Sequence, residues 1–462
     1  MRVIVVMLGL LVPASSLPAQ RNLAPPDSLD GYIQREMRGR RIPGLALAIA
    51  RNGRILTAKG YGLADVQNDV PTRPETRFEL ASITKQFTAA AILLLVEEGK
   101  VDLDASIATY LPDIPEGWKP ITIRHLLTHT SGLPPLGEGF TGFRAQFGFR
   151  PINIPTALMY DAARADTLRF PPGERYLYSD VGYFLLGVIT EKASGVPWRD
   201  FVRQRVFESL AMTDTYVLDQ VRIHKNEARG YTIRDGDLVN IRRIRQYETP
   251  SHFGIFSHVH DLVKWDAALY TDRFLSATSR AEMWTPVRLA DGSSHPYGFG
   301  WRVWRQRGHA IQQHRGITGT EIVRLPEDTL VIVVLTNLGS GPGINNQGIA
   351  LEIAEMMLPT LRRAPLVETP VGEAELRRFV GKYSSGERLA EISIERGRLH
   401  LTPPGASRSV ELVFQGNNTF EARLVDRRVV FEAERRGEIS GYTVFSRGDV
   451  PPVRFVRADR QR

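Results

Sequence analysis

Three short patterns in the chain carry side chains suited to serine acyl transfer. They are Ser82-Ile83-Thr84-Lys85, Tyr178-Ser179-Asp180 and His314-Arg315-Gly316. A serine hydroxyl is a weak nucleophile at neutral pH, so acyl chemistry on it needs a base within hydrogen-bond reach and donors directed at the developing oxyanion. Serine and lysine three positions apart on a helix share one face, which places an amine beside the hydroxyl. Together the patterns indicate a serine acyl-transfer site.

The position of the serine–lysine pattern adds to its weight. Taken alone, Ser82 is suited to capping a helix, and Lys85 to a solvated place in the first turn. A lysine is unfavourable near a helix N-terminus, however, because the helix dipole there favours anions. Lys85 also precedes Phe87 and the alanines at 89–91, so it enters an apolar helix. This placement indicates a cation retained for chemistry.

Hydrophobic patterning predicts the elements that position these residues. Residues 84–98 are apolar on nearly all sides and Gly99 follows where a helix end is expected, which predicts a buried helix. Residues 45–50 and 55–61 flank Asn52-Gly53, a pair that favours a tight type I′ hairpin. An antiparallel sheet therefore begins early in the chain.

Strands return only after a long helical stretch. From residue 99 to about Trp265 the pattern is one of helices and loops, and strand-like runs follow at 297–303, 321–324 and 330–336. His314 lies on a further strand-like run. A helical insert between early and late strands of one sheet is the simplest arrangement. The sequence thus predicts an α/β fold, with an antiparallel sheet flanked by helices and an all-helical lobe.

The length predicts two domains. A chain of 462 residues exceeds the size at which a single core stops growing, and 42% hydrophobic with 24% charged residues is an ordinary globular composition. Prolines and charges at 359–370 mark a boundary, beyond which short runs alternate apolar and polar residues. We expect a larger domain at residues 21–362 and a small antiparallel β-barrel at residues 371–462.

The first twenty residues are typical of a secretory signal peptide. One charge at Arg2 precedes an apolar stretch at 3–12, and small residues end at Ala19. The apolar stretch is too short for a membrane span, which needs about 20 residues. We therefore expect residues 1–20 to be removed, a periplasmic or secreted protein, and no stable membrane insertion afterwards.

Composition also bears on partners. The chain has no cysteine, which excludes disulfides and thiolate metal sites. Its net charge of +8 comes with acidic residues interspersed among the arginines, so we expect a mixed-sign surface and no nucleic-acid partner. From the net positive charge we expect at most a weak contact with anionic polymers of the cell envelope.

Further patterns accompany the three chemical ones in a consistent order. Phe78-Glu79-Leu80-Ala81 precedes the serine, residues 126–133 have the sequence LLTHTSGL, and Pro171-Pro172-Gly173 leads to Tyr178. With these segments, residues 28–359 resemble the serine β-lactamase-like hydrolases, specifically the class C branch that includes D-amino-acid carboxypeptidases and aminopeptidases, esterases and transacylases. The resemblance implies a β-lactamase/transpeptidase-like fold. The tail, with Gly381-Lys382-Tyr383 near its start, resembles the β-domain often appended to such hydrolases.

The resemblance also implies roles for individual residues. Ser82 is the residue acylated, and Lys85 and Tyr178 share the general-base work. The amides of Ser82 and Ile317 form the oxyanion hole. Asp180, His314 and Gly316 belong to the substrate-binding side, and no cofactor or metal is implied. These roles suit the chemistry, because a desolvated lysine loses affinity for its proton and a tyrosine facing a cation gives up its proton more readily.

Two residues depart from the family pattern. The middle motif usually ends in asparagine, whereas Asp180 is a carboxylate that cannot donate to an amide carbonyl of the acyl group. If Asp180 lies near Lys85, its charge should hold the lysine protonated and shift the base role toward Tyr178. The third motif often opens with lysine, and His314 brings a titratable donor instead. Recognition of a β-lactam carboxylate is therefore less favoured, and esters or peptides suit the site at least as well.

Other histidines have structural explanations. His125 and His129 are four apart but lack a glutamate in the zincin position, so we expect structural roles for both. His258 and His260 precede an apolar helical run for which Ser257 is the expected cap. Tyr176 is expected to pack, because the spacing to Asp180 favours Tyr178 as the catalytic phenol.

These observations predict an exported serine hydrolase that forms an acyl-enzyme on a small ester, amide, β-lactam or D-amino-acid peptide. The alternative is a non-catalytic cell-envelope-binding protein that retains the hydrolase fold. Asp180 and the unexplained β-domain motivate that alternative. The intact Ser82, Lys85 and Tyr178 weigh against it.

Overall fold

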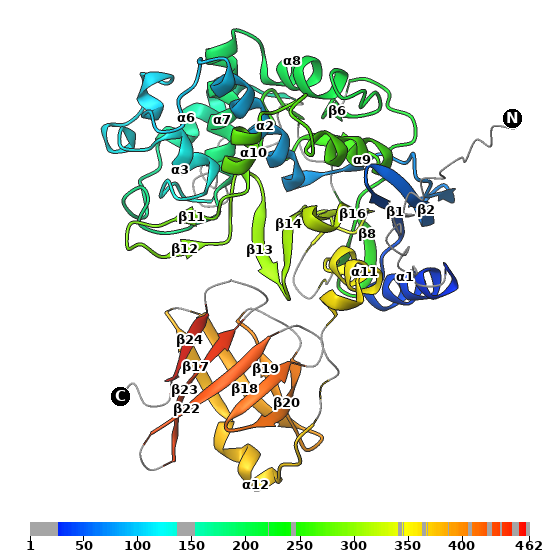
Figure 1. Cartoon of the computed structure of the whole chain (residues 1–462), viewed down its shortest axis with the longest axis vertical. Coiled ribbons are helices and arrows are strands. Elements are labelled where there is room, and N and C mark those ends of the chain that lie inside the picture. The colour runs from blue at the N-terminus through cyan, green and yellow to red at the C-terminus, as the bar shows by residue number, and fades with distance from the viewer. Residues whose placement is uncertain are drawn as a thin grey trace, which may run out of the picture.

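The computed structural model describes residues 26–135, 153–219, 221–241, 246–340, 344, 346–362, 366, 368–386, 388–404, 409–422, 427–434, 437–445 and 452–458. The predicted signal peptide lies outside the described residues. Two bodies are visible, a large domain with a central sheet and a smaller barrel formed by the C-terminal part of the chain (Figure 1).

A seven-stranded antiparallel sheet forms the middle layer of the large domain. Its strands lie in the order β13-β14-β15-β16-β1-β2-β3. They are β1 (Gly44–Arg51), β2 (Arg54–Asp65), β3 (Val70–Pro71), β13 (Arg302–Gln306), β14 (His309–Arg315), β15 (Glu321–Leu325) and β16 (Leu330–Thr336). Early β1 pairs with late β16, so that Leu45 lies opposite Thr336. The prediction of a helical insert between early and late strands of one sheet is therefore confirmed.

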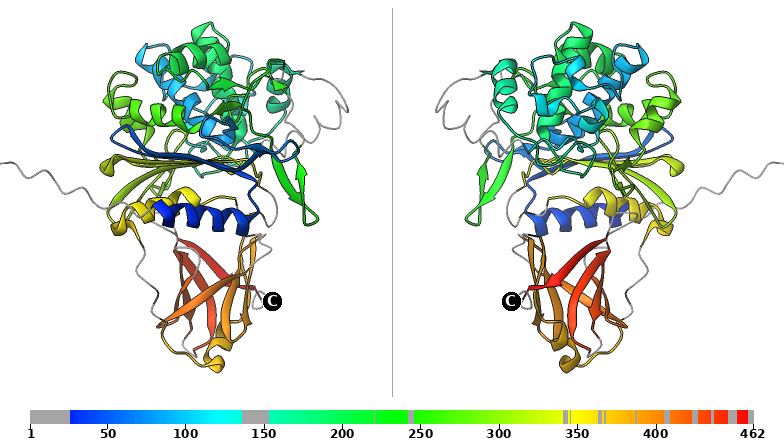
Figure 2. Two further views of the ribbon diagram at one scale, coloured as in Figure 1. Left: turned by 90° about the vertical axis from the view of Figure 1, so that its right-hand side faces the viewer. Right: turned by 90° about the vertical axis from the view of Figure 1, so that its left-hand side faces the viewer.

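Helices cover both faces of this sheet (Figure 2). On one face lie α1 (Pro26–Arg40) and α11 (Ile349–Met357). The other face carries the helical lobe, made of α2 (Thr84–Glu97), α3 (Ile123–Leu127), α6 (Thr156–Arg164), α7 (Asp180–Ser194), α8 (Trp198–Val202), α9 (Val259–Ala268) and α10 (Ala277–Met283).

Residue size along β1 explains how the helices fit. Ala46, Ala48 and Ala50 face the lobe and belong to its core cluster, whereas Leu45 and Leu47 belong to the cluster on the face of α1 and α11. Side chains alternate across a strand, so the small residues gather on one face. The alanines leave room for lobe helices close to the sheet.

The hairpin and the buried helix occur where the sequence predicts them. Asn52 and Gly53 join β1 to β2 with φ of 52° and 70°, the positive values that a type I′ turn requires. Helix α2 is buried over most of its length, and Gly99 with φ of 67° follows its end. Both predictions are confirmed.

The expected strand at 297–303 is largely wrong. Strand β13 begins only at Arg302, and the residues before it form a turn-rich segment. Gly300 has φ of 75°, and a Cβ there would lie 2.8 Å from the carbonyl carbon and oxygen of Lys85. The alternating glycines of this segment therefore permit close contact with the backbone of α2, and they do not mark a strand.

Short strands occupy the connections of the large domain. They are β4 (Phe78–Glu79), β5 (Asn153–Ile154), β6 (Tyr216–Val217), β7 (Tyr231–Arg234), β8 (Asp237–Asn240), β9 (Gln246–Tyr247), β10 (Ile255–Ser257), β11 (Val287–Arg288) and β12 (Ser294–His295). Strand β10 pairs with both β4 and β6. This pairing ties the segment that leads into Ser82 to the segment that follows His252.

The C-terminal residues form a closed eight-stranded antiparallel barrel, as the sequence predicts. Its strands are β17 (Gly381–Ser385), β18 (Arg388–Glu395), β19 (Arg398–Thr402), β20 (Val410–Gly416), β21 (Thr419–Ala422), β22 (Arg428–Ala433), β23 (Ile439–Phe445) and β24 (Val453–Arg457), preceded by α12 (Glu373–Leu376). Its core is rich in aromatic residues, among them Phe379, Phe420, Phe431 and Tyr442. The barrel lies on the side of α1 and α11, away from the helical lobe (Figure 2).

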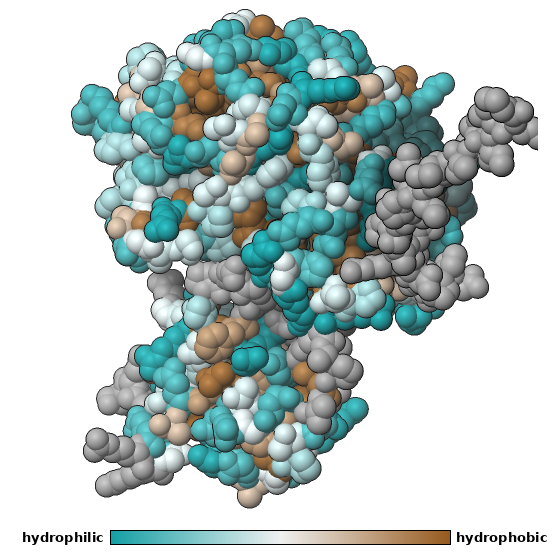
Figure 3. All heavy atoms as spheres, viewed as in Figure 1, coloured by the Kyte–Doolittle hydropathy of each residue, from teal (hydrophilic) through white to brown (hydrophobic). Residues whose placement is uncertain are grey.

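Hydrophilic residues cover much of the face shown in Figure 3, where hydrophobic residues appear in separate areas on both domains. Across the described part of the chain, none of the helices combines the length and apolarity needed to span a bilayer.

Replacing Gly300 by alanine should destabilise the large domain. Gly195 is a matched control, because its φ of 74° is nearly the same but no atom lies within 4 Å of a Cβ placed there. Both substitutions should cost about 1–2 kcal/mol for the left-handed backbone, and Gly300→Ala should cost about 1–3 kcal/mol more from overpacking against Lys85. Denaturant unfolding followed by circular dichroism measures both, and equal losses would contradict the close contact.

Candidate active site

Ser82 lies at the centre of the short helix η1 (Ala81–Ile83), which leads directly into α2. The residue before it, Ala81, has φ of 47°, a left-handed conformation that costs a residue with a Cβ about 1–2 kcal/mol. Ser82 itself is only half-buried, whereas Ala81 and Ile83 are buried. The strained bend thus leaves Ser82 accessible although its two neighbours are buried.

The end of β14 is fixed against this bend. Thr320 Oγ1 donates to the carbonyl of Leu80 at 3.0 Å, and Thr318 Oγ1 donates to that of Glu79 at 2.8 Å. A Cβ on Gly316 would lie 2.2 Å from Thr320 Oγ1 and 2.4 Å from the Leu80 carbonyl oxygen. Gly316, which the resemblance placed on the substrate-binding side, therefore permits close contact between two segments of the protein.

Two backbone amides beside this contact are candidates for an oxyanion hole. Ile317 follows Gly316 and is 60% exposed, and its carbonyl accepts from Ser340 at 2.7 Å. Within the described residues, neither the Ile317 amide nor the Ser82 amide donates to a backbone carbonyl outside its own element. Both amides are therefore available to an oxygen that approaches Ser82.

Lys85 is fully buried one helical turn beyond the serine. Its Nζ donates to Ser82 Oγ at 3.3 Å, to Asp180 Oδ1 at 2.6 Å and to the His252 carbonyl at 2.8 Å. An ammonium has three donors, so each has a partner. A neutral amine would fit the same positions with the Ser82 hydrogen bond reversed, and electrostatics must decide between the two forms.

The Asp180 carboxylate favours the ammonium. Burial alone would lower the pKa of Lys85, but Asp180, and next to it Tyr178, raise this pKa above its usual value. Burial would likewise raise the pKa of Asp180, and the charge of Lys85 instead lowers it to about 2. The pair is therefore ionised at neutral pH, in agreement with the effect expected of Asp180 near Lys85.

Tyr178 lies against the same ammonium. Its ring centroid is 4.9 Å from Lys85 Nζ, and its hydroxyl is buried and forms no hydrogen bond of good geometry with the described residues. Burial raises the pKa of Tyr178 above its usual value, while the charge of Lys85 and polar contact with Lys85 and Ser82 oppose that rise. The cation thus acts in the direction expected from the sequence, but desolvation outweighs it and the net change in the pKa of Tyr178 is upward.

His314 does not offer a donor to a substrate at Ser82, although the sequence placed it on the substrate-binding side. It is 3% exposed, and the Arg315 amide donates to its Nδ1 at 2.9 Å. Its Nε2 lies 3.0 Å from the hydroxyl of Tyr297. Burial holds the pKa of His314 well below its usual value, so the ring is neutral. The neighbouring Arg315 pairs with Glu321 at 3.3 Å.

Tyr297 joins His314 to a second buried histidine. The Ser179 amide donates to His129 Nδ1 at 3.1 Å, which leaves Nε2 to donate to the Tyr297 hydroxyl at 3.1 Å. The rings of His129 and Tyr178 are 4.2 Å apart. This network packs against the Tyr178 ring through His129 and contacts the end of β14 through His314.

The other sequence candidates have structural contacts. Tyr176 stacks on His295 with centroids 3.7 Å apart, and His125 Nδ1 accepts from the Thr122 amide at 3.2 Å. The cap of α9 is His258 and not Ser257, since His258 Nδ1 accepts from the His260 and Asp261 amides. Ser257 is the last residue of β10. No cluster of three or more histidine, aspartate or glutamate side chains suited to a metal occurs among the described residues.

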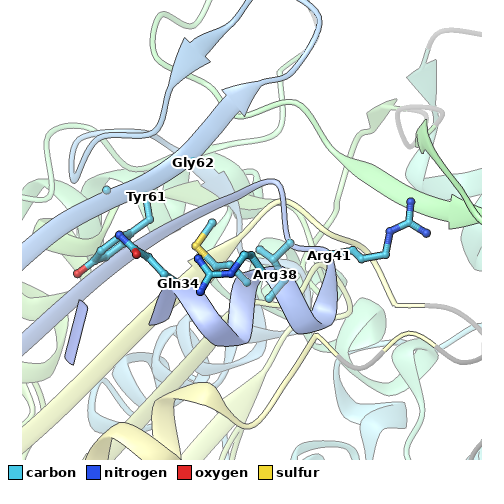
Figure 4. A pocket seen from close by; sticks show the side chains of 8 residues that line it. Gln34, Arg38, Arg41, Tyr61 and Gly62 are labelled. Atoms are coloured by element: carbon cyan, nitrogen blue, oxygen red, sulfur yellow. The ribbon is translucent and has the colours of Figure 1, made fainter. Parts of the chain in front are cut away.

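A groove of about 620 Å³ between α1 and β2 contains none of these residues. Figure 4 shows Gln34 and Arg38 of α1 and Arg41, which follows the helix, together with Tyr61 and Gly62 of β2. Helix α1 lies on the sheet face opposite the lobe, and Ser82 belongs to the lobe side. The chemistry of the chain therefore points to Ser82 and not to this groove.

Three contributors to the site were not identified from the sequence. They are His252, whose carbonyl holds Lys85, Tyr297, which bridges two histidines, and Gly300, which permits close packing against α2. The closely spaced glycines at 298 and 300 were the available signal for Gly300. A backbone carbonyl such as that of His252 leaves no signal in residue type.

Comparison with known proteins defines the class to which this fold and site belong. The family model described as Beta-lactamase matches residues 29–353. Penicillin-binding protein 4* of Bacillus subtilis (strain 168) is 30% identical over 417 residues, which cover 84% of this chain and 89% of that protein. The chain belongs to the Beta-lactamase family and is a serine hydrolase by that membership.

Solved structures agree with this assignment. An octameric penicillin-binding protein homologue from Pyrococcus abyssi has a TM-score of 0.66 and 25% identity, covering 93% of this chain and 99% of that chain. A D-amino acid amidase from Ochrobactrum anthropi SV3, complexed with L-phenylalanine, has a TM-score of 0.60 and 26% identity, covering 72% and 98%. The first likeness extends over both the large domain and the barrel.

Replacing Asp180 by asparagine should lower the pKa of Lys85. The substitution removes the carboxylate that raises this pKa and leaves the burial that lowers it. In protein labelled with ¹³C in the lysine side chain, the Lys85 resonance should titrate at lower pH in the variant, and its absence from Lys85→Arg assigns it. An unchanged or raised midpoint would contradict the dominance of the ion pair.

Proposed function

We propose that this protein is an exported hydrolase that cleaves a small ester, amide or D-amino-acid peptide through an acyl-enzyme on Ser82. The observation that carries the proposal is the contact of Lys85 Nζ with Ser82 Oγ at 3.3 Å and with Asp180 at 2.6 Å. The chain keeps a charged lysine at a fully buried position, which costs several kcal/mol of desolvation unless the charge is compensated. A non-catalytic scaffold has no need of such a cation.

The reaction divides into acylation and deacylation. Ser82 Oγ attacks the carbonyl carbon while its proton passes to the Lys85–Tyr178 pair, and the amides of Ser82 and Ile317 stabilise the oxyanion. The bond to the leaving group then breaks, and the proton passes to the departing amine or alkoxide. Water attacks the acyl-enzyme by the same sequence in reverse, which releases the acid and restores the Ser82 hydroxyl.

The two groups divide the proton transfer unequally. Asp180 holds Lys85 as an ammonium, so Lys85 cannot accept the proton of Ser82. The base must be deprotonated before the reaction, and Tyr178 is the group that loses its proton. The Tyr178 phenolate beside the ammonium is therefore the base. Since burial raises the pKa of Tyr178, this form becomes more populated as the pH rises. Activity on a neutral ester should accordingly increase from neutral to alkaline pH.

The neutral state of His314 favours esters and amides as substrates. Substrates whose carboxylate must be bound by a positively charged side chain are less favoured. The ring is buried and uncharged, so it supplies no positive charge at the end of β14. A solved D-amino acid amidase is among the similar structures, and that likeness supports amides of amino acids in particular.

Export is supported by the N-terminal sequence, with its short apolar stretch and small residues before residue 20. The substrate would then be met in the periplasm or outside the cell. Cell fractionation that recovered the chain from the cytosol with its N-terminus intact would contradict export without touching the assigned chemistry.

Ser82→Ala should abolish covalent labelling by a fluorophosphonate probe, because the probe reacts with an activated serine hydroxyl. The wild-type protein should be labelled at Ser82, as peptide mass spectrometry can verify. Ser179, which lies close by but donates to the Pro134 carbonyl, is the matched serine, and Ser179→Ala should remain labelled. An unlabelled wild-type protein would favour the non-catalytic alternative.

Tyr178→Phe should slow acylation by roughly 10²- to 10⁴-fold, the usual contribution of a general base. The ring and its packing on His129 are preserved, so the loss should appear in the rate and not in stability. Stopped-flow release of p-nitrophenol from p-nitrophenyl acetate measures the step. Tyr176→Phe is the control and should retain activity, because Tyr176 packs on His295. Full turnover in Tyr178→Phe would refute the role of the phenol.

A further inference from the structure

One oxygen of the Asp180 carboxylate is uncommitted. Oδ1 accepts from Lys85 Nζ at 2.6 Å, whereas Oδ2 has no hydrogen bond or ion pair with any residue that the structure describes. The Asp180 side chain is 35% exposed and that of Lys85 is fully buried. The accessible side of this ion pair is therefore its carboxylate.

The Asp180 carboxylate lies close to the nucleophile. Lys85 Nζ is 3.3 Å from Ser82 Oγ and 2.6 Å from Asp180 Oδ1, so the ammonium bridges the serine and the carboxylate. The side chains of Ser179 and His252, which flank this region, are 1% and 3% exposed and do not present polar groups to a ligand. A substituent on the α-carbon of an acyl group bound to Ser82 would therefore meet Asp180.

The charges around Asp180 leave this carboxylate a single cationic neighbour. The titratable groups that act on it or respond to it are Lys85, Tyr178, His129, His252 and His314. Burial holds the pKa of His252 at about 4 and the pKa values of His129 and His314 well below their usual range, so all three rings are neutral. Among the described residues, Lys85 is the cation that acts on Asp180, and it occupies the other oxygen.

We propose that Asp180 selects acyl groups bearing a free α-ammonium, so that the preferred substrates are esters and amides of unacylated amino acids, including N-terminal residues of peptides. This inference rests on the proposed function and names the substrate class of the same site. The ammonium would donate to Oδ2 while Lys85 donates to Oδ1, and the carboxylate would hold two cations.

The carboxylate also disfavours the main alternative. An N-acylated substrate offers the carboxylate only a neutral N–H in place of the ammonium, and Asp180 has no proton to donate to the added amide carbonyl. An asparagine at this position could donate to that carbonyl. The charge of Asp180 should therefore strengthen the binding of free amino-acid substrates relative to N-acylated ones.

Three methyl esters that differ only at the α-carbon test the proposal. They are alanine methyl ester, in both enantiomers, N-acetylalanine methyl ester and methyl propionate. The wild-type kcat/KM should be roughly 10- to 100-fold higher for the better alanine enantiomer than for the other two esters, which is the range for a hydrogen bond to a charged group. Asp180→Asn should remove most of this preference, read as the ratio of kcat/KM between the esters within each protein.

The pH dependence gives a second readout. Above the pKa of an α-amino group, about 7.7–8.0, the alanine ester loses its charge. Its kcat/KM relative to methyl propionate should then fall about tenfold for each further pH unit until the preference is gone. Taking the ratio at each pH cancels the titration of the enzyme's own base. The ratio in Asp180→Asn should be nearly flat with pH.

Asp272→Asn is the matched control, since Asp272 also pairs with a basic residue, Arg280, but at the surface, with 73% of its side chain exposed. It should keep the wild-type ratio. Equal kcat/KM for the three esters, a preference that survives in Asp180→Asn, or no hydrolysis of alanine ester by an enzyme active on p-nitrophenyl acetate would overturn the proposal and leave the hydrolase function standing. Absence of both fluorophosphonate labelling and ester hydrolysis would overturn the proposed function, and the inference with it.

Discussion

The ion pair between Lys85 and Asp180 is the interaction on which the rest of the site depends. A fully buried ammonium is unfavourable without compensation, so the lobe must bring the start of α7 and the His252 carbonyl to the first turn of α2. The close approach of Gly300 to the Lys85 backbone completes the enclosure. These contacts at the first turn of α2 therefore fix the position of the Lys85 ammonium.

Enclosing that charge affects the other titratable groups. His129, His252 and His314 lie within its field and are buried, and both effects disfavour their protonated forms. Tyr297 can then bridge two neutral rings without leaving a buried charge unpaired. Lys85 and Asp180 form the ion pair beside Ser82, and the Tyr178 ring lies against its ammonium. Because Lys85 is held as a cation, Tyr178 is the group that we propose as the general base.

The sequence predicts this fold well where local chemistry decides the structure. Asn52-Gly53 defines a hairpin by its need for positive φ, and the apolar run of α2 has one consistent solution, a buried helix. The prediction fails where tertiary contact decides. The segment before β13 has strand-like residues but bends because Gly300 must meet α2, and His258 replaces Ser257 as a cap because Ser257 is already in β10. In the site, residue types identify Ser82, Lys85 and Tyr178, but burial, which the types do not encode, determines that His314 is neutral.

Position 180 links the choice of base to the choice of substrate. A neutral amide there would leave Lys85 free to lose its proton under the influence of burial, and it would offer a donor to an acyl carbonyl. A carboxylate reverses both effects, because it fixes the lysine as a cation and presents an acceptor with a full negative charge. The proposed role of the phenol in proton transfer and the proposed preference for cationic substrates therefore arise from the same charge at Asp180. A substitution that removes this charge should alter both together.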